Sequence, residues 1–234
     1  MIRCAAILLV CGGPLPAQEL RTPGEEVLEE IYAARALNDE AALARSLREA
    51  GEIHRYPASE QEARKLLEAV LPSLKARADQ VVIAALDALT RMAAEETGRE
   101  IEPFLRSFKP ELSVLPRYLA ALRAAAAVRA PVLVAPLLNV ARKCEDITVA
   151  GQAWMALSSY HAAPVALRKQ VVSKMIEAAS ALSRGQGRAR RARWFAMRPP
   201  ALRALQLLVG RKLNSVDQFS DWWKIAKTQK NPWR

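Results

Sequence analysis

The segment AALDAL at residues 84–89 decides the fold, because close copies of it return further along the chain. AALRAA stands 36 residues later, at 120–125, and QAWMAL stands another 32 residues on, at 152–157. A second opening also recurs, since EPFL at 102–105 corresponds to APLL at 135–138, 33 residues on. Apolar residues in these segments are spaced by three and four, as on one face of an α-helix. The pattern therefore predicts two amphipathic helices that alternate with a period of about 30 to 40 residues.

Composition also favours an all-α chain. Alanine and leucine account for 44 and 30 of the 234 residues, whereas β-branched and aromatic residues are sparse. A unit of two amphipathic helices cannot bury its own apolar face, so each unit stacks on the next. We therefore predict an α-α superhelix of about three or four helical pairs. An irregular helical bundle is the alternative, because it would have the same periodicity.

From about Gln80 to Ala179 this series of helices resembles the HEAT-repeat family, whose fold is a solenoid of helical pairs. HEAT-type repeats often carry an Asp and an Arg or Lys at fixed positions of their inner loops. Asp87 with Arg91, or with Arg123, could stand in for that pair here. The resemblance implies a HEAT-like solenoid that offers a long surface for binding rather than an enclosed catalytic pocket.

Changes in composition and helix signals divide the chain into five parts. These are a signal peptide at 1–17, N-terminal helices at 18–78, HEAT-like helical repeats at 79–182, a basic loop at 183–197 and a C-terminal helical cap at 198–234. Within the second part, Ser59 and Glu62 fit a capping box. In such a box Ser59 accepts a hydrogen bond from the amide of Glu62, and the Glu62 carboxylate reaches back.

The first residues have the layout of a secretory signal peptide. Residues 4–16 carry no charge, Arg3 precedes them, and the small residue Ala17 stands before Gln18. The run is too short to span a membrane as a helix. We therefore predict that the protein is exported to the periplasm or the outside of the cell.

The cysteines allow one alternative to a cleaved leader. Cys11 could be the lipidated first residue of a lipoprotein, although Val10 stands where that motif prefers Gly, Ala or Ser. A mature chain that begins near Gln18 keeps only Cys144, which cannot form an internal disulfide. We expect Cys144 to be a packed thiol.

The C-terminal segment carries a second resemblance. PALRALQLLVGR at 200–211, followed by FSDWWK at 219–224, is similar to the ending of exported HEAT-repeat proteins of planctomycete-type bacteria. An end repeat has no neighbour, so apolar side chains must cover its core. We assign this structural cap to Phe219, Trp222 and Trp223. Flat aromatic rings could instead form a clamp for a sugar or a base.

Positive charge is concentrated in the second half of the chain. Residues 1–117 hold 15 basic and 19 acidic residues, a balance of −4, whereas residues 118–234 hold 20 and 5, a balance of +15. Guanidinium groups pair with phosphate, sulfate and carboxylate groups. The arginines that we assign to a candidate anion or partner site are Arg184, Arg188, Arg190, Arg191, Arg193 and Arg198.

Three interpretations of this basic segment stay open. It can be a solvated loop in an arginine-rich protein. It can be a docking surface for an acidic protein partner, an anionic polymer or a membrane headgroup. It can also be a nucleic-acid site in which Trp194 and Phe195 stack on bases. Because an export signal disfavours nucleic acid, that partner ranks below the others.

The sequence lacks the motifs that would indicate an enzyme. It has no glycine-rich phosphate loop, no Gly-x-Ser-x-Gly segment and no paired histidines at metal-ligand spacing, since His54 and His161 are its only histidines. We predict no catalytic residue, no metal and no cofactor. The predicted function is that of an exported, non-catalytic scaffold for protein–protein interaction. Binding of a polyanion through the basic C-terminal half is the alternative.

Overall fold

The chain folds into α-helices joined by short turns, in a computed structural model that describes residues 21–106, 111 and 114–233. The α-helices are α1 (Pro23–Ala36), α2 (Glu40–Ile53), α3 (Glu60–Val70), α4 (Asp79–Met92), α5 (Gly98–Leu105), α6 (Leu115–Val128), α7 (Val134–Lys143), α8 (Ile147–Ser158), α9 (Val165–Ser183), α10 (Arg188–Val209) and α11 (Val216–Ala226). Short 3₁₀ segments are η1 (Leu71–Lys75), η2 (Glu95–Thr97), η4 (Pro131–Leu133) and η5 (Ser159–Ala162). The predicted signal peptide and Cys11 lie outside the described residues.

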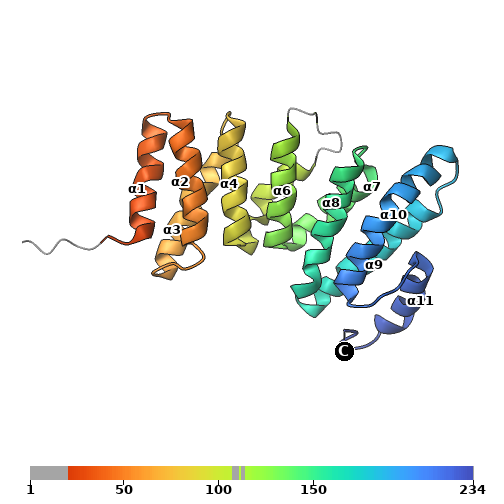
Figure 1. Cartoon of the computed structure of the whole chain (residues 1–234). Helices are drawn as coiled ribbons and strands as arrows, with labels where there is room; N and C mark the ends of the chain where they lie inside the picture. Colours follow the sequence, from red (N-terminus) through yellow and green to blue (C-terminus); the bar gives the residue numbers. More distant parts are fainter. Residues whose placement is uncertain (1–20, 107–110, 112–113, 234) are drawn as a thin grey trace, which may run out of the picture.

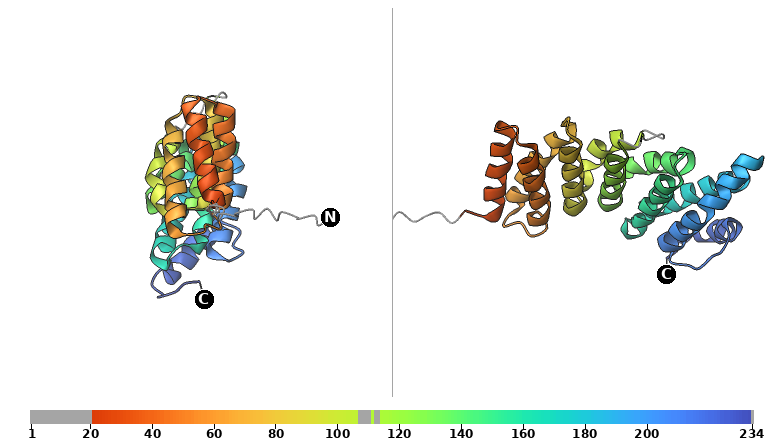
Figure 2. Two further views of the ribbon diagram at one scale, coloured as in Figure 1. Left: turned by 90° about the vertical axis from the view of Figure 1, so that its left-hand side faces the viewer. Right: turned by 45° about the horizontal axis from the view of Figure 1, so that its top comes forward.

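The helices form two rows along one axis, as Figures 1 and 2 show. In the first row α2, α4, α6, α8 and α10 pack on one another in turn, and in the second row α5, α7, α9 and α11 do the same. At the N-terminal end α1 packs on both α2 and α3. Consecutive helices from α4 onward alternate between the rows, which is the arrangement of an α-solenoid. The predicted all-α superhelix is therefore confirmed, and the irregular bundle is excluded.

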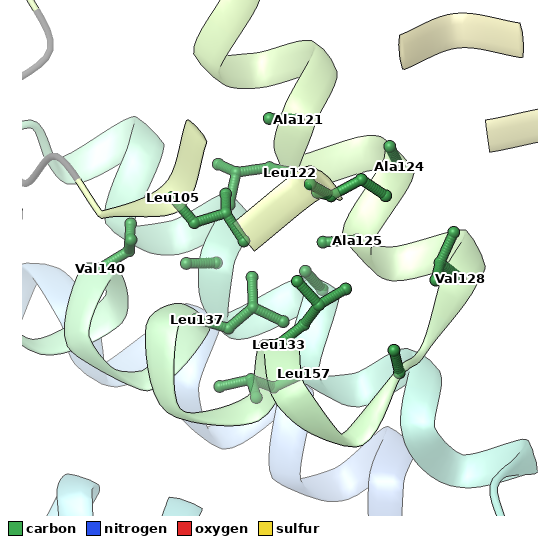
Figure 3. Packing of buried hydrophobic residues seen from close by; sticks show 14 of the residues in the cluster. Leu105, Ala121, Leu122, Ala124, Ala125, Val128, Leu133, Leu137, Val140 and Leu157 are labelled. Carbon is green, nitrogen blue, oxygen red and sulfur yellow. The ribbon is translucent and has the colours of Figure 1, made fainter. Parts of the chain in front are cut away.

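A continuous apolar core fills the space between the rows. Figure 3 shows Leu122 of α6, Leu133 of η4, Leu137 of α7 and Leu157 of α8 meeting there, and all four side chains are buried. Burying one leucine side chain contributes about 1.5–3 kcal/mol. The repeated Ala/Leu segments thus supply both the helix-forming residues and the stacking face.

The first row is packed closely enough to require a residue without a side chain. At Gly51 of α2 a Cβ atom would lie 2.8 Å from the Cα atom of Ala88 in α4, which is closer than two carbon atoms can approach. Gly51 therefore lets the α2 backbone touch α4 at the AALDAL segment, residues 84–89.

The predicted capping box at α3 forms in part. Ser59 Oγ accepts from the Glu62 amide at 3.1 Å, as expected. The Glu62 carboxylate accepts from the amide of Ala58 at 2.5 Å and from the hydroxyl of Thr22, which caps α1. The buried Glu62 side chain therefore ties the start of α3 to the start of α1 rather than closing a simple local box.

The predicted basic loop at 183–197 is wrong over most of its length. Helix α10 begins at Arg188, so 188–197 are its first turns, and only a short turn separates it from the end of α9. Arginine and alanine are good helix formers, and Gly187, with a φ of 91°, ends the turn. The boundary at 198 falls inside α10, and the C-terminal helix α11 starts only at Val216.

Candidate functional site

Charged side chains pair across successive helices in the N-terminal half of the first row. Glu52 of α2 binds Arg91 of α4 at 2.7 Å, and Asp87 of α4 binds Arg123 of α6 at 2.9 Å. A further pair joins Asp79 at the start of α4 to Arg117 in the first turn of α6. Asp87, Arg91 and Arg123, the residues that the repeat pattern singled out, therefore belong to a ladder of ion pairs between repeats.

The ladder does not continue into the later helices. Glu177 is the only acidic residue between 147 and 216. Within α8, α9 and α10 as the structure describes them, no lysine or arginine lies within ion-pairing distance of a carboxylate. The positive charge of these helices is therefore not neutralised by neighbouring acids.

Two arginines of this region instead bind carbonyl oxygens at helix ends. Arg193 Nη2 donates to the carbonyls of Arg142 and Cys144 at 2.9 and 2.7 Å, at the C-terminal end of α7. Arg168 Nε donates to the carbonyl of Leu208, in the last turn of α10, at 2.8 Å. The last carbonyls of a helix lack partners within the helix, and a cation there also offsets the helix dipole. Arg193 therefore has a structural role in addition to any role in binding.

Three of the predicted arginines lie together on the exposed face of α10. Arg188, Arg191 and Arg198 are spaced by three and seven residues, which places them on one side of the helix, away from the buried Met197. Phe195 occupies the same side with 69% of its surface exposed. We call this set the outer arginine stripe. Arg184 is also exposed, but it lies at the end of α9, outside the stripe.

The other two predicted arginines, the exposed Arg190 and the half-buried Arg193, lie on the side of α10 that faces the ends of α7 and α9. Arg190 and Arg193 line a cavity of about 390 Å³ together with Arg142 and Lys143 from the end of α7. Ala181, Leu182 and Gly185, from the end of α9 and the turn after it, complete the wall. We call this cavity the basic pocket. In the sequence, the one sign of this pocket is the basic pair Arg142 and Lys143 at the end of α7. Nothing in the sequence places that pair beside α10.

The C-terminal aromatic residues pack around α11. The Phe219 ring is fully buried, Trp223 is 8% exposed, and Trp222 is half-buried against the same core. Trp233 stacks on Trp223 with ring centroids 6.2 Å apart, and the Arg168 guanidinium lies 3.9 Å from the centre of the Trp233 ring. This packing covers the end of the core on the α9 side, and it leaves the Trp223 ring closed to a sugar or a base.

The described residues contain no arrangement that indicates catalysis or metal binding. No group of three or more His, Cys, Asp or Glu side chains among them could hold a metal ion. The Cys144 side chain is fully buried, and this burial raises the pKa of its thiol. His54 ends α2, and burial lowers the pKa of its imidazole. Among the helices in the described ranges, none is both long and apolar enough to cross a bilayer.

Fold and surface together define a non-globular class of protein, a helical-repeat solenoid with a basic C-terminal half. No protein-family model matches the chain, and no curated protein matches it. Among solved structures it is similar to the crystal structure of an engineered protein from the Northeast Structural Genomics Consortium. The match has 17% sequence identity, covers 80% of this chain and 97% of that chain, and has a TM-score of 0.40.

Proposed function

We propose that the protein is a non-catalytic, HEAT-like scaffold that docks an acidic protein partner through the outer arginine stripe. The two-row stack gives an extended surface of the kind that repeat proteins use for binding. The repeat spacing of the Ala/Leu segments and the ladder of Asp87 and Arg123 support the likeness to HEAT repeats.

The observation that carries the proposal is that the arginines of the outer arginine stripe have no acidic partner among the described residues. Arg188, Arg191 and Arg198 form no ion pair with any described residue, and they lie on the same side of α10 as the exposed Phe195. Arginine and aromatic side chains are enriched at protein interfaces, where a ring supplies buried area and guanidinium groups select acidic partners. A charged surface of this kind also speeds association, and added salt weakens that effect.

The place of action that we propose is outside the cytoplasm. The uncharged run at residues 4–16 before Ala17 supports this, with a lipid anchor on Cys11 as the variant form. Intact-mass measurement of the protein from fractionated cells tests it. A mature chain in the envelope that starts at Gln18, or at a lipidated Cys11, supports export, and an uncleaved chain in the cytoplasm overturns it.

Docking is tested with poly-L-glutamate as a protein-like acidic probe. The charge-reversed variant R188E/R191E/R198E is compared with R45E/R48E/R64E, which makes the same change of charge on exposed residues of α2 and α3. Fluorescence anisotropy of the labelled probe is followed at low and at high sodium chloride. We expect the stripe variant to bind at least about tenfold more weakly and the control variant to bind within about threefold of the wild type.

Two further probes separate this function from polyanion binding. A single-stranded oligonucleotide and vesicles that contain phosphatidylglycerol are offered to the same proteins. Preference for poly-L-glutamate at matched charge supports protein docking. Equal losses in both variants, or tighter binding of the oligonucleotide or the vesicles, overturn it in favour of a general attraction for polyanions.

A further inference from the structure

The basic pocket is built where three helix ends meet. Arg142 and Lys143 come from the last turn of α7, Leu182 from the end of α9, Gly185 from the turn after it, and Arg190 from the first turn of α10. The lining residues include four cationic side chains and no acidic one. Its volume of about 390 Å³ lies within the range of small-ligand sites.

Two of the four charges lack a compensating partner. Arg193 is bound to the α7 carbonyls, and Lys143 makes a contact of its own. Arg142 and Arg190, by contrast, form no ion pair with any residue in the described parts of the chain. Glu177 lines an adjoining groove that also contains Arg142 and Lys174, but its carboxylate pairs with neither. Two guanidinium charges thus remain for a ligand.

One side of the pocket is held by contacts within the fold. The two carbonyl bonds fix the Nη2 atom of Arg193 and leave its Nε and Nη1 donors without a bond to a described residue. A Cβ atom on Gly185 would lie 3.1 Å from the Cβ atom of Arg190, so the absence of a side chain at 185 lets the Arg190 stem pack against this turn. Arg193 is therefore already ordered before a ligand binds, whereas the exposed side chains of Arg142 and Arg190 become ordered on binding.

From these contacts we infer that the basic pocket binds a phosphate group, as the free ion or at the end of a phosphate monoester. A phosphate monoester carries close to two negative charges near neutral pH, which matches the two unpaired guanidinium groups of Arg142 and Arg190. Its oxygens accept the planar pairs of hydrogen bonds that arginine offers. Leu182 and Ala181 provide an apolar wall for the organic part of a monoester. This site is separate from the outer arginine stripe and does not depend on the proposed docking function.

Isothermal titration calorimetry with inorganic phosphate and with glycerol 3-phosphate tests the inference on the full protein. The variant R142Q/R190Q removes the two unpaired charges. The variant R188Q/R191Q removes two charges from the stripe on the same end of α10 and serves as the control. Neither pair of side chains makes a bond within the described fold, and thermal unfolding of both variants checks that they fold like the wild type.

We expect R142Q/R190Q to weaken phosphate binding at least about tenfold and R188Q/R191Q to leave it within about threefold. Tighter binding of glycerol 3-phosphate than of inorganic phosphate identifies a monoester as the source of the group, and the reverse order identifies the free ion. No binding to the wild type, or equal losses in the two variants, overturns the inference. The docking proposal is tested separately, because it predicts that R188E/R191E/R198E loses poly-L-glutamate binding. That result does not depend on whether the basic pocket binds phosphate.

Discussion

The two halves of the solenoid share one kind of core and differ in how they use charge. In α4 and α6 three arginines of the first row, Arg91, Arg117 and Arg123, pair with carboxylates of the preceding helix of that row. From α8 to α10 the described arginines that make bonds, such as Arg168 and Arg193, bind carbonyls at helix ends. The helices up to α6 also have contacts of the second type, from Arg35 to the carbonyl of Ala69 and from Arg129 to the carbonyl of Ala127.

This difference separates the arginines that bind groups of the fold from those that do not. The last carbonyls of a helix lack partners within the helix, and Arg193 and Arg168 donate to such carbonyls at the ends of α7 and α10. Arg142, Arg190 and the three arginines of the outer arginine stripe form no ion pair with a described residue, and their mutual repulsion opposes the compact state. These unpaired arginines are the side chains on which both proposals are built.

The largest expected effect tests whether the two halves do share one kind of core. Leu86 in α4 and Leu205 in α10 are both fully buried. We expect Leu86→Ala and Leu205→Ala each to lower the free energy of unfolding by about 2–5 kcal/mol, because each leaves a cavity. Urea denaturation measures this, and the exposed Leu37→Ala and Leu207→Ala are the matched controls. If only Leu86→Ala lowered the free energy of unfolding, the two halves of the solenoid would not share one kind of core.

The next prediction concerns the arginines that bind carbonyls. Arg193→Met keeps much of the side-chain volume but removes both donors to the end of α7. We expect a loss of about 1–3 kcal/mol in the free energy of unfolding, since two carbonyls lose their partner. Arg191→Met on the exposed stripe should change it by less than about 0.5 kcal/mol. Equal effects of the two substitutions would show that Arg193 is not a helix-end ligand.

The next prediction concerns how the free energy of unfolding depends on pH through Glu62, at the N-terminal end of the solenoid. The hydrogen bond from Thr22, followed by the backbone amide of Ala58, holds the pKa of Glu62 below its ordinary value. A carboxyl group with a lowered folded pKa stabilises the fold above its unfolded pKa, and this contribution is lost as the pH falls through the folded value. We therefore expect Glu62→Gln to cost about 1 kcal/mol at neutral pH and progressively less in acid.

The measurement for Glu62 is the free energy of unfolding of wild type and variant at a series of pH values. Glu60→Gln is the control, because Glu60 is exposed at the start of the same helix. The difference between wild type and Glu62→Gln should shrink below the ordinary glutamate pKa of 4.5. A difference that stays constant through this range contradicts the assignment.

Much of the fold follows from sequence because its rules are local and repeated. Ala/Leu faces that recur every 30 to 40 residues or so can bury themselves only by stacking, so the period alone predicts the two rows. The loop expected at 183–197 failed because Gly185 and Gly187 suggested a turn, although the arginine and alanine that follow favour helix.

The basic pocket could not be predicted in the same way. Arg142 and Arg190 stand on different repeats, and they meet only because of how α7, α9 and α10 are tilted against one another. The angles between repeats depend on many small side-chain contacts, so no short motif encodes them. By contrast, Asp87 and Arg123 occupy equivalent positions of successive repeats, and their pairing follows from the period itself.

The smallest expected effect concerns this pair. Both side chains are partly exposed, so solvent screens their attraction, and a double-mutant cycle with Asp87→Asn and Arg123→Gln should give a coupling energy of only about 0.2–1 kcal/mol. Added salt should reduce it further. The same cycle between Asp87 and Arg203, an exposed arginine of α10 that forms no ion pair with a described residue, should give no coupling. If the coupling between Asp87 and Arg123 survives high salt, the N-terminal ladder fixes how the repeats stack. The helices of the C-terminal half, which have no such ladder, should then vary more in the angles between them.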